Sequence, residues 1–235
     1  MKDPAIAIDG LRFAWTRDAP ALLDINRFEL ARGERLFLRG PSGSGKSTLL
    51  GLIAGVLEPQ AGRIDVLGHE MSALSGARRD RVRADHLGVI FQLFNLVPYL
   101  SVVSNVTLPV RFSKARRRAA GEDAGAEARR LLARLGLEGD EILSRRVMDL
   151  SVGQQQRVAA ARALIGGPGL VIADEPTSAL DADTRDRFIE LLTDEARRSG
   201  AALLFVSHDA SLAPHFDRGV DLAEINASAH RLETA

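Results

Sequence analysis

A glycine-rich loop that follows a short apolar run and precedes a helical run constrains the fold of this chain more than any other feature. Residues 40–47 read GPSGSGKS, in which a glycine, four further residues and a second glycine precede lysine and serine. Glycines let backbone N–H groups point inward at an anion, and the helix that follows adds the positive end of its dipole. This order of strand, loop and helix is typical of an α/β unit that binds phosphate.

The lysine of this loop stands out in a chain that otherwise relies on arginine. The only lysines are Lys2, Lys46 and Lys114, which indicates that position 46 requires a compact charge for the β- and γ-phosphates rather than a planar fork. Ser47 is expected to place its hydroxyl on Mg²⁺. A Gly/Ser turn that only caps a helix is the structural alternative. The predicted nucleotide-binding residues of the loop are Gly40, Pro41, Ser42, Gly43, Ser44, Gly45, Lys46, Ser47 and Thr48.

Composition limits the remaining possibilities. The 235 residues include no cysteine, which excludes disulfides and thiolate metal sites. The 31 basic residues balance 31 acidic ones, so no bulk field favours nucleic acid or anionic lipid. No apolar run approaches the roughly 18 to 20 residues of a membrane-spanning helix, and the N-terminus lacks the apolar stretch of a signal peptide. We therefore expect a cytoplasmic chain that meets a membrane only through a partner.

Hydrophobic patterns along the chain predict one domain built of two interleaved parts. Strands are expected at residues 5–8, 11–15, 25–30, 35–38, 63–67, 88–91, 170–173 and 202–206, and helices at 46–57 and 184–198. Residues 102–165 read as mostly helical, with residues 116–118 on a solvated basic face. The whole chain, 1–235, is therefore predicted to be a single domain. Its catalytic core would comprise 1–95 and 166–235, with an inserted helical subdomain at about 96–165.

Two carboxylates follow the predicted strand at residues 170–173. The segment reads LVIADE, so Asp174 ends an apolar strand and Glu175 comes next. Asp174 is expected to hold Mg²⁺ through its water shell, and Glu175 to orient or partly deprotonate the water that attacks the γ-phosphate. His208 follows the last predicted strand in the run VSHD, where a neutral imidazole could contact the γ-phosphate or that water. Solvated acids at a strand end and a structural histidine are the alternatives.

Residues 150–154 read LSVGQ, followed by QQRVAAARAL, and this segment resembles the signature of ABC transporter ATP-binding subunits with one change. The resemblance extends over about residues 6–216. It implies the P-loop NTPase fold of ABC ATPases, which is an α/β, RecA-like core with a β-rich N-terminal subdomain and an inserted α-helical subdomain that carries the signature. It also implies an ATPase whose cofactors are ATP and Mg²⁺.

The same resemblance implies roles for Trp15 and Gln92. Trp15 is expected to stack on adenine, a role normally filled by tyrosine. Gln92, in the run VIFQLFNLVP, is expected to contact Mg²⁺ or water and to couple the ATP site to a membrane subunit. The predicted catalytic residues are therefore Glu175, His208 and Gln92, and the predicted Mg²⁺ ligands are Ser47, Gln92 and Asp174.

The signature also implies partners. Family members pack head to tail as homodimers, so Ser151, Gly153 and Gln154 would complete the ATP site of a second copy from a helix N-terminus. Residues 178–181, SALD, resemble the loop that crosses between subunits. Val152 stands where the family usually has glycine, so a β-branched side chain would lie close to the opposing nucleotide and weaken closure. Integral-membrane permease subunits are the other implied partners.

The segment at residues 98–110, PYLSVVSNVTLPV, resembles the lipoprotein-release and macrolide-efflux branch of the family. This resemblance predicts an ATPase at the cytoplasmic face of a bacterial inner membrane that powers a permease by ATP-driven dimer closure. A signalling or cell-division ATPase that drives a permease-like partner without transport is one alternative. An amino-acid importer ATPase is another. A soluble ABC protein acting on DNA or ribosomes is less favoured, since such proteins commonly carry two fused ATPase domains.

Overall fold

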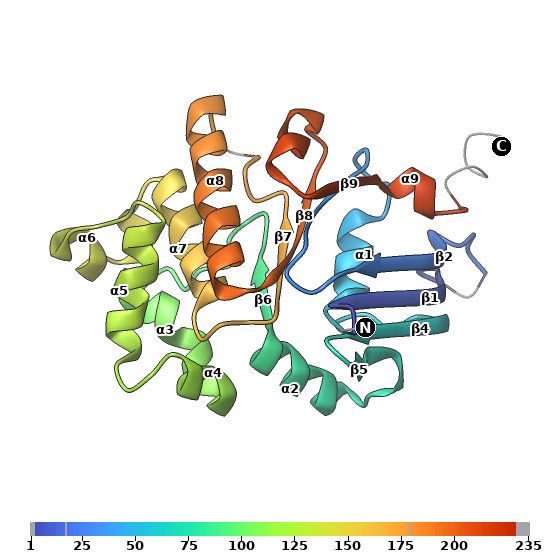
Figure 1. The fold of residues 1–235 in the computed structure, drawn as a ribbon, viewed down its shortest axis with the longest axis horizontal. Coiled ribbons are helices and arrows are strands. Elements are labelled where there is room, and N and C mark those ends of the chain that lie inside the picture. The colour runs from blue at the N-terminus through green and yellow to red at the C-terminus, as the bar shows by residue number, and fades with distance from the viewer. Residues whose placement is uncertain (1–2, 17, 179, 229–235) are drawn as a thin grey trace.

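Two β-sheets organise the molecule. The computed structural model describes residues 3–16, 18–178 and 180–228, and it places an antiparallel sheet at one end, a parallel sheet in the middle and a group of helices at the other end (Figure 1). The antiparallel sheet has the order β2–β1–β4–β5, with β1 at Ile6–Phe13, β2 at Leu23–Leu30, β4 at Ala61–Val66 and β5 at His69–Glu70. The parallel sheet has the order β6–β7–β8–β3–β9, with β6 at Leu87–Ile90, β7 at Leu170–Asp174, β8 at Ala202–Ser207, β3 at Arg35–Arg39 and β9 at Arg218–Asp221.

Helices connect these strands and cover the parallel sheet. They are α1 (Lys46–Ile53), α2 (Gly76–His86), α3 (Val102–Phe112), α4 (Lys114–Ala119), α5 (Ala124–Arg134), α6 (Asp140–Ser144), α7 (Val152–Leu164), α8 (Ala182–Ser199) and α9 (Leu222–Ile225), with 3₁₀ turns η1 (Met71–Ala73), η2 (Val147–Asp149) and η3 (Ala210–His215). Among the helices that the structure describes, none combines the length and apolar character needed to span a membrane.

The parallel sheet separates two hydrophobic cores. On β7, Leu170 and Ile172 face the core formed with α1 and the antiparallel sheet, whereas Val171 and Ala173 face the core formed with α3, α5, α7 and α8. Successive strand residues point to opposite faces, and a sheet covered on both faces requires apolar side chains on both. This requirement explains why β7 reads as a continuous apolar run without alternation.

Most predicted elements are confirmed, with three local differences. Residues 5–8 and 11–15 were expected as separate runs, whereas the structure has one strand, β1, with an irregularity between Asp9 and Arg12 where Gly10 takes φ +59°. The helix after the glycine-rich loop ends at Ile53 rather than at residue 57. Helix α2 was not predicted, because its sequence GARRDRVRADH carries too few apolar residues to show a helical stripe.

The prediction of a solvated basic face at residues 116–118 is wrong for Arg116. Its side chain is among the fully buried ones, and its guanidinium donates hydrogen bonds to the main-chain oxygens of Leu87, Ala163 and Ile165. These oxygens lie at the start of β6 and around the end of α7, so Arg116 joins α4 to both. Burial lowers the pKa of Arg116 to about 10, and the side chain therefore remains charged at neutral pH.

Candidate active site

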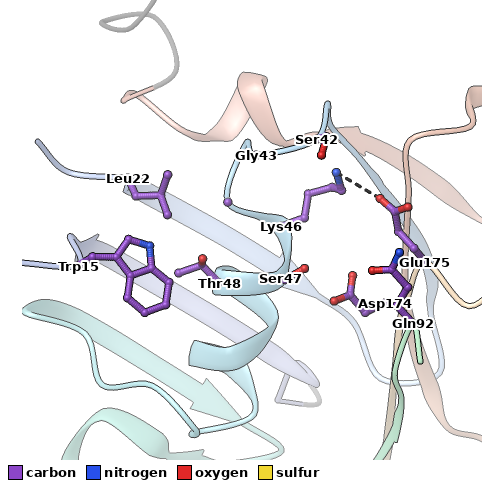
Figure 2. Close-up of a pocket in the computed structure, with 11 residues that line it drawn as sticks. Trp15, Leu22, Ser42, Gly43, Lys46, Ser47, Thr48, Gln92, Asp174 and Glu175 are labelled. Carbon is purple, nitrogen blue, oxygen red and sulfur yellow. Dashed lines mark ion pairs between the residues drawn. The ribbon is translucent and has the colours of Figure 1, made fainter. Parts of the chain in front are cut away.

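Segments that follow three parallel strands form one site. β3 leads into the glycine-rich loop, β7 ends at Asp174, and β8 leads into His208. Parallel strands present their carboxyl ends at the same edge of a sheet, where α/β proteins bind ligands. A cleft of about 400 Å³ opens there, lined by Trp15, Leu22, Ser42, Gly43, Gly45, Lys46, Ser47, Thr48, Gln92, Asp174 and Glu175 (Figure 2).

The glycine-rich loop has the backbone that an anion cradle requires. Gly43 and Gly45 take φ +79° and +100°, values that side chains disfavour. Within the described part of the chain, no side chain caps the start of α1, so its first N–H groups are left for a ligand. The buried Ser44 Oγ has no hydrogen-bond partner among the described residues. These features suit phosphate oxygens. The other predicted loop residues, Gly40, Pro41 and Ser44, are not part of the cleft lining.

Lys46 joins the loop to the carboxylate of Glu175, which follows β7. Its side chain is 6% exposed, and Nζ donates to the main-chain oxygens of Gly40 at 2.7 Å and Pro41 at 2.8 Å. The same ammonium lies 3.4 Å from Glu175 Oε1 (Figure 2). The charge is therefore desolvated and fixed in position at the floor of the cleft.

The three predicted Mg²⁺ ligands, Ser47, Gln92 and Asp174, line this cleft together. Burial raises the pKa of Asp174, the Ser47 hydroxyl opposes that shift, and the charge of Glu175 adds to it. A divalent cation would offset the cost of keeping Asp174 ionised. Hydroxyl, amide and carboxylate oxygens are ligands that Mg²⁺ accepts, usually beside substrate phosphates and water. The residues present therefore fit Mg²⁺.

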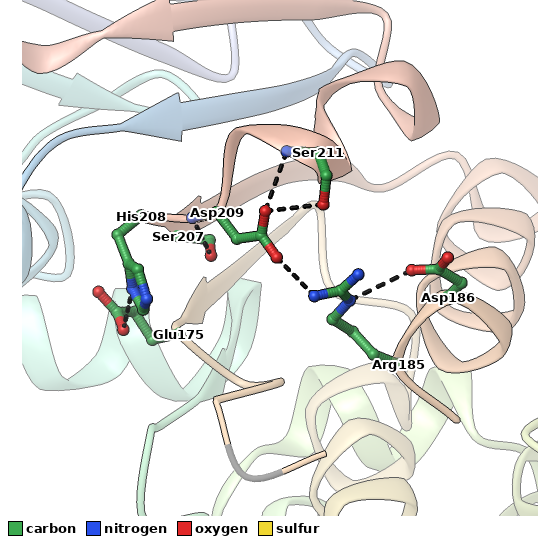
Figure 3. Close-up of polar contacts among 7 residues, drawn as sticks. All are labelled: Glu175, Arg185, Asp186, Ser207, His208, Asp209 and Ser211. Atoms are coloured by element: carbon green, nitrogen blue, oxygen red, sulfur yellow. Dashed lines mark hydrogen bonds and ion pairs between the residues drawn. The ribbon is translucent and has the colours of Figure 1, made fainter. Parts of the chain in front are cut away.

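Glu175 and His208 contact each other at the edge of the cleft. Glu175 Oε2 lies 3.0 Å from His208 Nδ1 (Figure 3). Glu175 takes φ +42°, a strained value for a residue with a side chain, and its N–H donates to the Val206 oxygen at 2.9 Å. Strain of this kind persists only where surrounding structure enforces it, and it gathers at functional sites. The two residues that the sequence places 33 positions apart therefore form one unit.

A charge network next to His208 was not predicted. Arg185 on α8 lies 2.5 Å from Asp209 Oδ2, and Asp209 Oδ1 accepts hydrogen bonds from the N–H and hydroxyl of Ser211 (Figure 3). The Ser211 hydrogen bonds are the largest cause of the lowered pKa of Asp209. Asp209 thus anchors the chain directly after His208. The contact of Asp209 with Ser211 is a local capping pattern of residues two positions apart. The contact of Asp209 with Arg185 depends instead on how α8 packs.

The predicted signature residues do not line this cleft. Ser151 and Gln154 form a capping box at the start of α7, where Ser151 Oγ accepts from the Gln154 N–H at 3.3 Å and Gln154 Oε1 accepts from the Ser151 N–H at 3.0 Å. The intervening N–H groups of Val152 and Gly153 lie in the first turn, where a helix supplies no partner. Their role toward a second copy stays a prediction. Of the segment 178–181, residue 179 lies outside the described residues.

Comparison with known proteins gives close similarities. A family model described as ABC transporter matches residues 23–178. The lipoprotein-releasing system ATP-binding protein LolD of Novosphingobium aromaticivorans is 41% identical over 228 residues, which cover 95% of this chain and 98% of LolD. The macrolide export ATP-binding/permease protein MacB of Chromobacterium violaceum is 36% identical over 226 residues, which cover 95% of this chain and 34% of MacB. A dimeric post-hydrolysis state of the ATP-binding cassette MJ0796, bound to ADP and Pi, matches with a TM-score of 0.82 at 31% identity and 95% coverage of both chains.

Proposed function

Because the chain belongs to the ABC transporter ATP-binding proteins, we propose that it binds MgATP in this cleft, closes on a second copy and powers a permease of the lipoprotein-release or macrolide-export type. The predicted family, ATPase activity and P-loop ABC ATPase fold are confirmed. One observation carries the site assignment: Lys46, Gln92 and Glu175, which come from three separate segments, line a single cleft.

Each residue has a part in the proposed reaction. Trp15 stacks on the adenine, while the loop N–H groups and Lys46 gather the phosphates. Mg²⁺ held by Ser47, Asp174 and Gln92 would supply positive charge to the β- and γ-phosphates.

Glu175 activates the attacking water: it orients this water and accepts its proton. His208 contacts Glu175 through Nδ1, which leaves Nε2 for the γ-phosphate or the water.

The proposed dimer places the start of α7 over the γ-phosphate of the second copy. There Ser151, Gly153 and Gln154 add N–H and side-chain groups at a helix N-terminus. Moving a closure equilibrium from 1:99 to 99:1 needs about 5.5 kcal/mol of differential binding. ATP can provide this energy only if it contacts both copies in the closed form. The dimer of the MJ0796 cassette, bound to ADP and Pi, supports the pairing of two copies.

A groove beside Gln92 suits the proposed permease contact at the inner-membrane face. Phe91 and Phe112 are 43% and 71% exposed, and both line a groove of about 310 Å³ with Asn95 and Pro109. Exposed apolar patches of this kind mark protein contacts. The groove would bury a segment of the permease next to the catalytic glutamine.

Arg162 on α7 supports coupling between this groove and the signature. It donates to the main-chain oxygens of Phe94 and Asn95 at 2.6 Å each, and these residues take φ +58° and +49°. The helix that begins with the signature therefore holds the segment that follows Gln92. We assign α7 to the helical subdomain, about residues 96–165, so a movement of that subdomain would reach Gln92 directly.

Reconstitution with a co-encoded membrane protein, where one co-purifies with this chain, tests the proposal. We expect the ATPase rate to rise when the partner is present in proteoliposomes, and to depend on release or movement of a substrate. Stimulation without any displaced substrate would favour the signalling alternative. An ATPase rate that is unaffected by every co-encoded membrane protein would contradict the permease assignment.

Val152→Gly is expected to raise the cooperative ATPase rate by a few-fold. Val152 is 47% exposed at the first position of α7, so its branched side chain would crowd the opposing nucleotide in the proposed dimer. ATPase rate as a function of protein concentration measures the effect. Val152→Ala is the matched control, because it removes the branch without adding glycine's backbone freedom. No change, or a fall, in both variants would reject the crowding explanation.

A further inference from the structure

The segment that presents Trp15 to the cleft is held by a side chain from another part of the chain. Gln60 Oε1 accepts a hydrogen bond from the Ala14 N–H at 2.5 Å, and Gln60 Nε2 donates to the Ala14 oxygen at 2.7 Å. A side-chain amide thus exchanges with one residue the same two bonds that an opposing strand residue would exchange in an antiparallel ladder.

This pairing continues the ladder past the point where the strands part. Ala61, the first residue of β4, pairs with Arg12, and the Gln60 N–H donates to the Arg12 oxygen at 3.0 Å. Beyond Arg12, the side chain of Gln60 makes the two hydrogen bonds that a main-chain partner would otherwise make. On the opposite edge, the Leu22 N–H donates to the Phe13 oxygen at 2.8 Å. The main chain of Phe13 and Ala14, directly before Trp15, is therefore held by hydrogen bonds on both sides.

The main chain before Trp15 is packed, because Phe13 and Ala14 are buried, but Trp15 itself has less support. A hollow of about 600 Å³ lies against the preceding segment, lined by Arg12, Ala14, Ala19, Ala21 and Gln60. Trp15 itself is 63% exposed, and its ring meets Phe13 edge to face, with centroids 5.2 Å apart and planes at 83°. The buried residues before Trp15, the hydrogen bonds to Ala14 and one ring contact thus hold the indole in the lining of the cleft (Figure 2).

We propose that Gln60 is a positioning residue for nucleotide recognition, which fixes the pose of Trp15 and so sets the affinity for the purine base. This inference rests on the proposed function, because it takes Trp15 as the base platform. Stacking depends on the tilt and offset of the ring, and that tilt follows the orientation of the Ala14 peptide. Lys46 begins α1, and Glu175 and His208 follow β7 and β8. These segments do not contact Gln60 through any hydrogen bond of the described residues, so the phosphate and water chemistry is expected to be independent of Gln60.

Gln60→Met tests the proposal, because methionine is of similar length and lacks the amide. We expect KM for ATP to rise about 3- to 10-fold, as the loss of two ordinary hydrogen bonds would produce, with kcat nearly unchanged. Trp15 is the only tryptophan, so the fluorescence emission of the protein reports the environment of the Trp15 ring directly. The emission change on adding MgATP should shrink in the variant. Gln60→Glu should also raise KM. Glutamate keeps the acceptor for the Ala14 N–H, but it replaces the donor to the Ala14 oxygen by a second oxygen, which repels it.

Two controls separate positioning from a general effect. Ala61→Met adds the same side chain at the neighbouring exposed position and should leave KM unchanged. Inorganic tripolyphosphate has no base, so its inhibition constant should be the same in the Gln60 variants and the parent. Equal KM values and equal Trp15 emission in parent and variants would overturn the proposal, as would an equal loss of tripolyphosphate affinity or a matching fall in kcat. Failure of the parent protein to hydrolyse ATP would instead reject the proposed function.

Discussion

Replacing Lys46 by alanine is expected to weaken MgATP binding about 100-fold or more. The ammonium is nearly fully buried, and two main-chain oxygens already fix it in place. Hydrogen bonds from a charged donor contribute about 1.5–3 kcal/mol each, and about 1.4 kcal/mol corresponds to a factor of ten in affinity. Loss of the contacts to the β- and γ-phosphates should therefore remove tight binding. Only the main-chain N–H groups of the loop would then remain to offset the negative charge of the triphosphate.

A titration that follows Trp15 emission, checked by nucleotide retention on a desalting column, measures this loss. Lys114→Ala is the matched control, because Lys114 is an exposed lysine outside the cleft, and it should bind MgATP like the parent. Lys46→Arg is expected to remain weak, since a planar guanidinium does not fit a site shaped for a compact ammonium. Undiminished affinity in Lys46→Ala would show that the loop is not the phosphate site.

Replacing Glu175 by glutamine is expected to slow hydrolysis by about two orders of magnitude or more while ATP binding and dimerisation persist. A positioned acid or base typically contributes about 10²- to 10⁴-fold to the rate. Glutamine keeps the shape of the side chain but cannot accept the proton of the attacking water. It also removes a negative charge 3.4 Å from Lys46 Nζ and beside Asp174. ATP affinity should therefore be equal to or higher than that of the parent.

Phosphate release under single-turnover conditions measures the chemical step, and light scattering after size-exclusion chromatography measures the dimer. Glu190→Gln changes the same functional group at an exposed position of α8 outside the cleft, and it should turn over normally. Parental turnover in Glu175→Gln would remove the catalytic assignment. A variant that binds ATP but stays monomeric would instead contradict the proposed closure around two nucleotides.

The sequence predicted the residues of the candidate cleft better than it predicted the contacts that support them. Lys46, Asp174 and Glu175 were identified from short motifs, because a phosphate cradle and a strand-end carboxylate are properties of consecutive residues. The burial of Arg116 was not predicted, because it depends on residues that are distant in the sequence. A run of three arginines reads as solvated, but the carbonyl groups that bury Arg116 come from residues up to 49 positions away.

What the sequence alone determined is therefore the local pattern: glycines where the loop needs left-handed backbone, a lysine at the start of the following helix, and acids at the end of an apolar strand. The tertiary structure decided which of these groups meet and what holds them. Lys46 forms an ion pair with Glu175, and Glu175 contacts His208. The side chain of Gln60 is hydrogen-bonded to Ala14, 46 positions earlier in the sequence. Such contacts depend on how strands are ordered and how loops pack, and no short segment encodes that order.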